Sequence, residues 1–373
     1  MRTQVLILGG GVLTPVLQKV LRQENFDAIV ISKCNSNFDK VFVGNSSVNY
    51  VPILAVENSY LTERLNTGQF SNGSVKTENF YDDSTPQDSN FEIVKGSYAD
   101  FIMKSTNNLN YVASSEKLYG KVVYTDPMPE IKAKVERHYI NQSRINYGKR
   151  LGFKDGLNPY SHFNDESNTI FYDDLQQVVI NMEGKFVLVN GQKIFYDVLI
   201  NTLPAPTFLK LASVEHLLTF YATSTAFVIM TSNEPLIENR LVYDCNRTSN
   251  IYRLFTPNKN AIVAQMSQLR SVDISAALKR AKEILDIRTD LSFVEEKTLR
   301  NCYPTKISNK EEFNLLRITM QAKDVLMFGR YAQWECLDLH ELNWQKLIYD
   351  QLQHFGSSVV FKRRHEQNLL NYL

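Results

Sequence analysis

Three consecutive glycines, Gly9–Gly11, form the group of residues whose spacing most clearly points to ligand chemistry. They follow a short apolar segment, Val5–Leu8, which predicts a buried strand, and they precede a helical pattern at 15–23. Pro15 fits an early helical position, because its missing N–H is not needed there. Backbone N–H groups at such a turn can meet a pyrophosphate without side-chain obstruction. The turn predicts dinucleotide binding; the alternative is a turn that only joins strand to helix.

The glycine turn departs from the usual dinucleotide pattern at two places. Gly9 and Gly11 match the first two glycines of G-x-G-x-x-G, but Thr14 occupies the third position. The second predicted strand, 28–31, is followed by Ser32 and Lys33 instead of the acidic residue that binds the ribose hydroxyls. Ser32 could substitute for this acid weakly, whereas Lys33 could meet a phosphate, as a basic group does in NADP sites.

A second candidate for phosphate recognition lies near the C-terminus. The apolar segment 325–328 predicts a strand that ends at Gly329, where the backbone can come close to a ligand. Arg330 follows, and a guanidinium can pair with a pyrophosphate through two hydrogen bonds. The alternative is an ordinary surface ion pair for Arg330 and a core position for Trp334.

The order of four separated segments resembles the FAD-binding superfamily of amine oxidases, protoporphyrinogen oxidase and UDP-galactopyranose mutase. The segments are the glycine turn, Asn201–Pro204, the Tyr252–Arg253 pair and Gly329–Trp334. The resemblance implies a Rossmann-like FAD domain, a strand closed by the N-T-x-P segment beside it, and a Tyr–Arg pair that faces the substrate. It also implies that the last segment returns the chain to the flavin.

Residues expected to act on the substrate follow from this resemblance. Arg253 is expected to contact an anionic substrate or intermediate, with Phe255 on the same face of its strand; a solvated strand arginine is the alternative. Tyr252, and with it Tyr303 and Tyr331, could line the site. His340 lies in the first turn of a predicted helix at 338–355, at the expected flavin edge. The expected catalytic residues are Arg253, Tyr252 and His340. The expected cofactor contacts are Gly9, Gly10, Gly11, Thr14, Ser32, Lys33, Thr202, Pro204, Gly329, Arg330, Trp334, Asp338 and Leu339.

The pattern of elements predicts an α/β fold: a parallel Rossmann-like sheet with a second α+β domain that contains an antiparallel sheet. We expect the FAD domain at 1–40, 170–212 and 318–373, and the substrate domain at 41–169 and 213–317. The polar, turn-rich stretch 66–97 predicts a flexible insertion. Asn190-Gly191 between two apolar runs predicts a hairpin, and Asp273 or Ser275 is expected to cap a helix at Ile274–Leu285. We also expect one helix and a strand at 98–118 and a helix at 129–144.

Composition excludes several other classes. Lys and Arg total 41 against 40 Asp and Glu in 373 residues, a net charge of +1, which gives no global attraction to nucleic acid or membrane. The basic run 362–365 leaves a local nucleic-acid contact open. The four cysteines show no CxxC spacing, so neither a zinc site nor a dithiol redox pair is expected. We expect no other metal site either. No apolar stretch is long enough to cross a membrane, and we expect a cytoplasmic protein.

These observations predict an FAD-dependent enzyme acting on a polar or anionic, small-molecule or nucleotide-type substrate. The flavin would either take a hydride or catalyse without net redox change. Two alternatives stay open at this point: a non-catalytic nucleotide-binding or assembly module, and an NADP-binding oxidoreductase.

Overall fold

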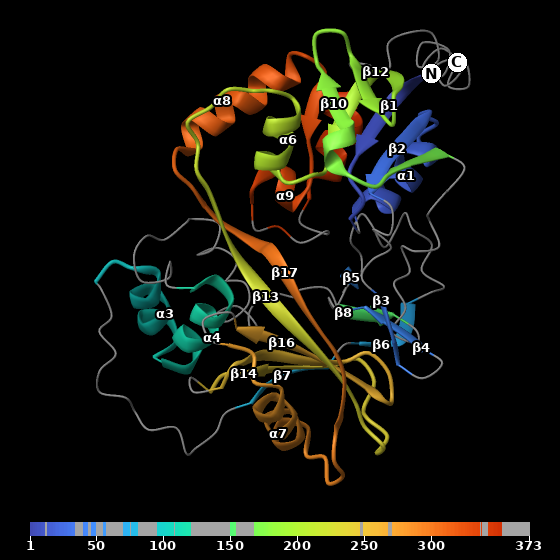
Figure 1. The fold of residues 1–373 in the computed structure, drawn as a ribbon. Helices are drawn as coiled ribbons and strands as arrows, with labels where there is room; N and C mark the ends of the chain where they lie inside the picture. The colour runs from blue at the N-terminus through green and yellow to red at the C-terminus, as the bar shows by residue number, and fades with distance from the viewer. Residues whose placement is uncertain are drawn as a thin grey trace, which may run out of the picture. The chain divides into compact units, whose positions relative to one another are not determined.

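The computed structural model divides into two compact units, each built from separate stretches of chain (Figure 1). Unit 1 comprises Met1–Asn37, Phe163–Leu218 and Asn309–Leu373, and unit 2 comprises Phe38–His162 and Thr219–Ser308. The structure describes residues 1–11, 13–33, 40–43, 46–49, 55–56, 70–74, 76–80, 95–107, 109–120, 150–153, 168–246, 249–267, 271–335, 337 and 342–352.

Unit 1 is built on a 7-stranded sheet with a parallel centre. The parallel strands lie in the order β9-β2-β1-β12-β18. Strand β12 also pairs with β11 in antiparallel orientation, and β11 pairs with β10 in the same way. Their bounds are β1 Arg2–Leu8, β2 Ala28–Lys33, β9 Thr169–Tyr172, β10 Val178–Asn181, β11 Phe186–Val189, β12 Gln192–Asn201 and β18 Val325–Met327. The predicted hairpin is confirmed, with Asn190 and Gly191 both at positive φ between β11 and β12.

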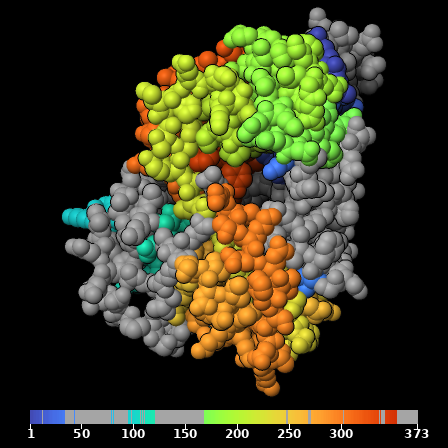
Figure 2. All heavy atoms as spheres, in the orientation of Figure 1, coloured from blue at the N-terminus to red at the C-terminus, as the bar shows by residue number. Residues whose placement is uncertain are grey.

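The helices of unit 1 complete a Rossmann-like α/β layer arrangement. Helix α1 buries Val16, Leu17, Val20 and Leu21, the apolar positions that predicted it. The other helical segments are α6 Ala205–Leu211, α8 Lys310–Gln321, α9 Arg330–Gln333 and a π-helical segment at Lys346–Leu352, while α1 spans Leu13–Gln23. In the space-filling view α6 lies beside the β10–β11–β12 strands (Figure 2). The mixed α/β fold class is therefore confirmed.

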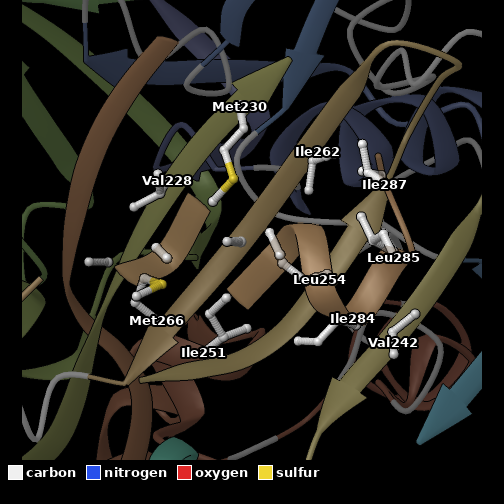
Figure 3. Packing of buried hydrophobic residues seen from close by; sticks show 14 residues of the cluster. Val228, Met230, Val242, Ile251, Leu254, Ile262, Met266, Ile284, Leu285 and Ile287 are labelled. Carbon is white, nitrogen blue, oxygen red and sulfur yellow. The ribbon is translucent and has the colours of Figure 1, made fainter. Parts of the chain in front are cut away.

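Unit 2 is built on a 6-stranded, mainly antiparallel sheet in the order β17-β13-β16-β15-β14-β7. The strands are β7 Lys76–Phe80, β13 Phe220–Thr231, β14 Arg240–Asp244, β15 Ile251–Thr256, β16 Ala261–Ser267 and β17 Ser292–Ile307. Helix α7, Ile274–Leu285, covers one face, and its Ala277, Ala281 and Ile284 belong to one buried cluster with Leu254 and Ile262 of the sheet. Figure 3 shows Ile284 and Leu285 of the helix beside the sheet residues of this cluster. The predicted N-cap is confirmed, because the Asp273 carboxylate accepts a hydrogen bond from Ala276 N.

Short elements complete unit 2. They are the β3–β4 hairpin at Lys40–Val43 and Ser46–Asn49, a sheet of β5 Ala55–Val56, β6 Phe70–Ser74 and β8 Arg150–Phe153, and helices α3 Tyr98–Thr106 and α4 Leu109–Tyr119. No helix among the described residues is long and apolar enough to span a membrane.

Within the stretch 66–97, the described residues include β6 and β7, and β7 gains backbone hydrogen bonds as a parallel edge strand on β14; the flexibility of this insertion stays a prediction. The expectation for the stretch that follows was wrong. Residues 98–118 form two helices and no strand, because α3 ends at Asn107, which adopts a left-handed φ of 50° and donates its N–H to Met103 O. The helix expected at 129–144 lies outside the described residues.

Candidate dinucleotide and anion sites

The carboxyl ends of the parallel strands in unit 1 bring the predicted glycines to one edge of the sheet. The register pairs Leu8 with Asn201 and Asn201 with Met327. The Gly9–Gly11 turn, Thr202 and Gly329 therefore follow neighbouring strands at the same level. In open α/β sheets, ligands bind outside this edge. The structure thus brings together segments that are widely separated in the sequence.

Two of these glycines are required by the protein itself. At Gly9 φ is +137°, and a Cβ would lie 2.0 Å from Thr202 Oγ1. At Gly329 φ is +99°, and a Cβ would lie 2.3 Å from Leu13 Cδ2. Gly11 differs, because a Cβ there would meet no atom of the described residues within 4 Å beyond its chain neighbours. Packing therefore does not explain Gly11, and its bare backbone leaves space where a pyrophosphate could approach.

Thr14, at the third glycine position of the motif, fits beneath the turn. Its Oγ1 donates to Gly9 O at 3.1 Å, and Thr202 Oγ1 donates to Leu8 O at 3.1 Å. The two hydroxyl oxygens lie 3.3 Å apart. The extra bulk of threonine is thus used to tie helix α1 to the ends of β1 and β12, and it does not push the helix away from the sheet.

The end of β2 carries the residues expected near the ribose. Ile31 pairs with Leu8, so Ser32 and Lys33 reach the same edge as the glycine turn. Ser32 is buried and its hydroxyl donates to Lys33 O at 3.4 Å. Lys33 is exposed and forms no ion pair with any residue that the structure describes. A cation, rather than the usual carboxylate, therefore occupies this corner.

The last segment of the motif begins where β18 ends. Arg330 opens α9, and its Nε donates to Leu337 O at 2.7 Å, which fixes the guanidinium. Trp334 is buried and ends α9 in a left-handed conformation with φ of 52°. Pro204 occupies the N-cap position of α6, without a side-chain cap hydrogen bond. Just before it, the Asn201 amide accepts a hydrogen bond from Leu203 N and donates one to Leu203 O. Asp338, Leu339 and His340 lie outside the described residues.

Arg253 and Tyr252 lie in unit 2, on the sheet face opposite α7. Adjacent strand residues normally point to opposite faces, but the pairing of β15 with β16 shifts register between Ile251 and Arg253. This irregularity lets the Arg253 guanidinium lie over the Tyr252 ring, 5.7 Å from its centroid. The bulge therefore gathers a cationic and an aromatic group on one face, as bulges beside functional sites often do.

Neighbouring strands hold the guanidinium in place. Arg253 pairs in register with Tyr243 and with Gln265, and its Nε donates to Gln265 Oε1 at 2.7 Å. Gln265 Nε2 donates to the Tyr303 hydroxyl at 3.0 Å, and Tyr303 meets Tyr119 of α4 edge-on, with ring centroids 6.4 Å apart. Hydrogen bonds thus link Arg253 through Gln265 to Tyr303, and a ring contact links Tyr303 to α4.

The Arg253 guanidinium has no carboxylate partner among the residues that the structure describes. Burial lowers the pKa of Arg253, but Tyr303, Tyr243 and Tyr252 outweigh burial and raise it above its ordinary value, so the side chain stays charged. A partly buried cation that meets no carboxylate in the described part of the chain is suited to bind an anion.

Two residues of this cluster, Gln265 and Tyr243, were not predicted from the sequence. Gln265 interrupts the otherwise apolar run Ala261–Met266 and is 1% exposed. A buried amide in such a strand needs hydrogen-bond partners, and this was the signal available. Tyr243 gave none, because it is one of 19 tyrosines and its contact depends on strand register.

Comparison with known proteins identifies the fold. No family model and no curated protein matches the sequence. Among solved structures, reduced UDP-galactopyranose mutase matches with a TM-score of 0.68 at 10% identity, over 95% of this chain and 94% of that one. The chain therefore shares the fold of this mutase structure.

Two further solved structures match over similar lengths. A CLA-producing fatty acid isomerase from P. acnes has a TM-score of 0.62 at 11% identity, covering 95% of this chain and 98% of that one. A candidate protoporphyrinogen oxidase from Exiguobacterium sp. 255-15 has a TM-score of 0.60 at 12% identity, covering 94% and 99%. The predicted resemblance is thereby confirmed for the fold.

Proposed function

We propose that this protein binds FAD at the carboxyl edge of the unit 1 sheet and is a flavin-dependent enzyme. The observation that carries the proposal is the open backbone at Gly11, beside two glycines whose Cβ space the protein itself fills. The fold supports the same cofactor, because the families that share it bind FAD. Bound FAD would supply a two-electron acceptor, or a flavin that catalyses without net redox change.

Residues from several segments of unit 1 would contact different parts of FAD. Backbone N–H groups of Gly9–Gly11 and the N-terminus of α1 would receive the pyrophosphate. Arg330 would add a positive charge beside it, with its Nε already engaged by Leu337 O. Thr202 and Pro204 would border the cofactor at the end of β12. Ser32 and Lys33 would lie near the adenosine ribose.

For the substrate, the proposal is an anionic small molecule or nucleotide recognised by Arg253. A charged guanidinium that meets no carboxylate among the described residues supports this role, and Tyr252 would border the same group. Replacing Arg253 with Ala should weaken the binding of an anionic substrate while leaving the FAD content unchanged. Equal substrate binding in the variant would contradict the role given to Arg253.

The absorbance spectrum of the purified protein tests the cofactor. We expect a band near ~450 nm, either as purified or after addition of FAD. Arg330→Ala should lower the amount of FAD retained after gel filtration. Arg2→Ala is the matched control, because Arg2 pairs with Asp197 near the start of β1, and it should retain FAD as the wild type does. A colourless protein that takes up no FAD would refute the proposal.

Lys33 favours a second candidate, an NADP-binding oxidoreductase. An exposed cation at the end of β2 could pair with the 2′-phosphate of NADP, where an acidic residue would repel it. NADPH binding that is lost in Lys33→Ala, together with no uptake of FAD, would favour this reading over the first. Uptake of neither ligand would favour a non-catalytic module.

A further inference from the structure

Gln265 is a neutral group at a position where the partly buried Arg253 could instead meet a carboxylate. Its Oε1 accepts from Arg253 Nε at 2.7 Å, and the side chain is 1% exposed. Buried charges in proteins are usually paired with an opposite charge. A carboxylate at this distance would neutralise the guanidinium, whereas an amide oxygen orients it without cancelling its charge.

The direction of the Gln265 amide is fixed from the other side. Amide oxygen and nitrogen are distinguished by their hydrogen bonds, and here Nε2 donates to the Tyr303 hydroxyl at 3.0 Å while Oε1 faces Arg253. Tyr303 lies on β17 and its ring contacts Tyr119. The acceptor for Arg253 is therefore held by residues from two other elements.

Within the described part of the chain, the Arg253 guanidinium has more donors than acceptors to receive them. A guanidinium offers five N–H groups; one bonds Gln265, and Tyr243 lies directly opposite Arg253 on β14. None of the described residues offers Arg253 a carboxylate. The donors left over match the fork geometry that carboxylates and phosphates bind.

We propose that Gln265 is a positioning residue that orients Arg253 and leaves its charge uncancelled for a bound oxyanion, a phosphate or a carboxylate, and that Tyr303 fixes the Gln265 amide for this purpose. The proposal rests on the anion-binding role of Arg253 proposed above. It adds a specific requirement, which is that the residue at position 265 must accept a hydrogen bond without carrying charge.

Calorimetric titration of the FAD-saturated protein tests this requirement, with inorganic pyrophosphate and succinate as separate probes. Titration of the Arg253→Ala protein measures the binding of each probe at other sites. The difference from the wild type is the Arg253-dependent binding. The probe that binds more tightly shows whether the site prefers a phosphate or a carboxylate. Gln265→Glu keeps the shape but adds a counterion, and should weaken this component by about ten- to a hundredfold. Gln265→Met removes the hydrogen bond without adding charge and should weaken it by about two- to tenfold.

The order of the two variants separates positioning from packing. A packing role alone predicts that Met, the poorer mimic of Gln, weakens binding at least as much as Glu. Asn260→Asp is the matched control, because it adds the same charge in the turn before β16, and it should bind as the wild type does. Tyr303→Phe should weaken the Arg253-dependent binding about as much as Gln265→Met does. If Gln265→Glu binds like the wild type while Arg253→Ala does not, the inference fails alone; if Arg253→Ala also binds normally, the proposed role of Arg253 fails with it.

Discussion

At the scale of single residues, the glycine turn accommodates a threonine, Thr14, where the dinucleotide-binding motif usually has a glycine. Thr14 replaces the third glycine of the motif, and its hydroxyl bonds Gly9 O while lying 3.3 Å from Thr202 Oγ1. The same Thr202 fills the space that a Cβ at Gly9 would need. A departure from the sequence pattern is thus compensated by a second residue, and the turn keeps its shape.

This arrangement predicts that Thr14→Val destabilises unit 1. Valine keeps the shape but leaves the Gly9 carbonyl without this partner, so the free energy of unfolding should fall by about 1 kcal/mol in urea titrations. Thr319→Val is the matched control, since its hydroxyl bonds Leu315 O on the exposed side of α8, and it should change stability much less. Equal effects of the two variants would contradict the role given to Thr14.

The sequence predicted the residues of the turn but not their partners. Gly9–Gly11 and Pro15 could be read from a short pattern, because strand, turn and helix are consecutive. The Thr14–Thr202 contact joins residues 188 positions apart and depends on the pairing of β1 with β12. Nothing in the local pattern around Thr202 indicates which strand end it will meet.

At the scale of elements, the most regular helix was also the most predictable. Helix α7 has the predicted bounds and cap, because its apolar spacing and its Asp273 cap agree. It is also anchored by an ion pair, since Arg280 on α7 makes two hydrogen bonds to the fully buried carboxylate of Asp244 on β14.

We predict that Arg280→Met strongly destabilises unit 2. The Asp244 carboxylate would be left buried without its partner, which typically costs about 3–5 kcal/mol. Thermal or urea unfolding measures this loss. Lys282→Met on the same helix removes only an exposed pair with Asp290 and should have little effect. A comparable loss in both variants would contradict the special role of Arg280.

The β15 bulge shows what strand periodicity alone cannot supply. Alternation places Arg253 with Phe255 and turns Tyr252 to the other face, whereas the register shift after Ile251 lets Arg253 and Tyr252 stack. Bulges depend on pairing with a neighbouring strand, so the aromatic contact of Arg253 could be found only in three dimensions.

At the scale of the whole molecule, the order of motifs was more informative than any motif alone. The mutase structure shares the fold at 10% identity, which agrees with a fold maintained by burial patterns and by a few glycines. The motifs predicted the fold class, but the sequence alone did not indicate β7 as an edge strand of the unit 2 sheet, because its polar residues resemble a loop.

FAD binding should protect three distant segments of unit 1 at once. Hydrogen exchange followed by mass spectrometry should show slower exchange at 9–14, 202–205 and 329–332 when FAD is added, because all three follow strand ends at the same edge. Protection limited to only one of these segments would contradict the shared site.

The affinity of Gly11→Ala for FAD tests the central claim most directly. In the described part of the chain, a Cβ at Gly11 meets no atom within 4 Å apart from its chain neighbours, so the variant should unfold at the wild-type temperature. The same Cβ would occupy the space assigned to the pyrophosphate, and we predict that FAD binding weakens by at least about tenfold in a fluorescence titration. Equal FAD affinity in the variant and the wild type, or no binding by the wild type, would contradict the account.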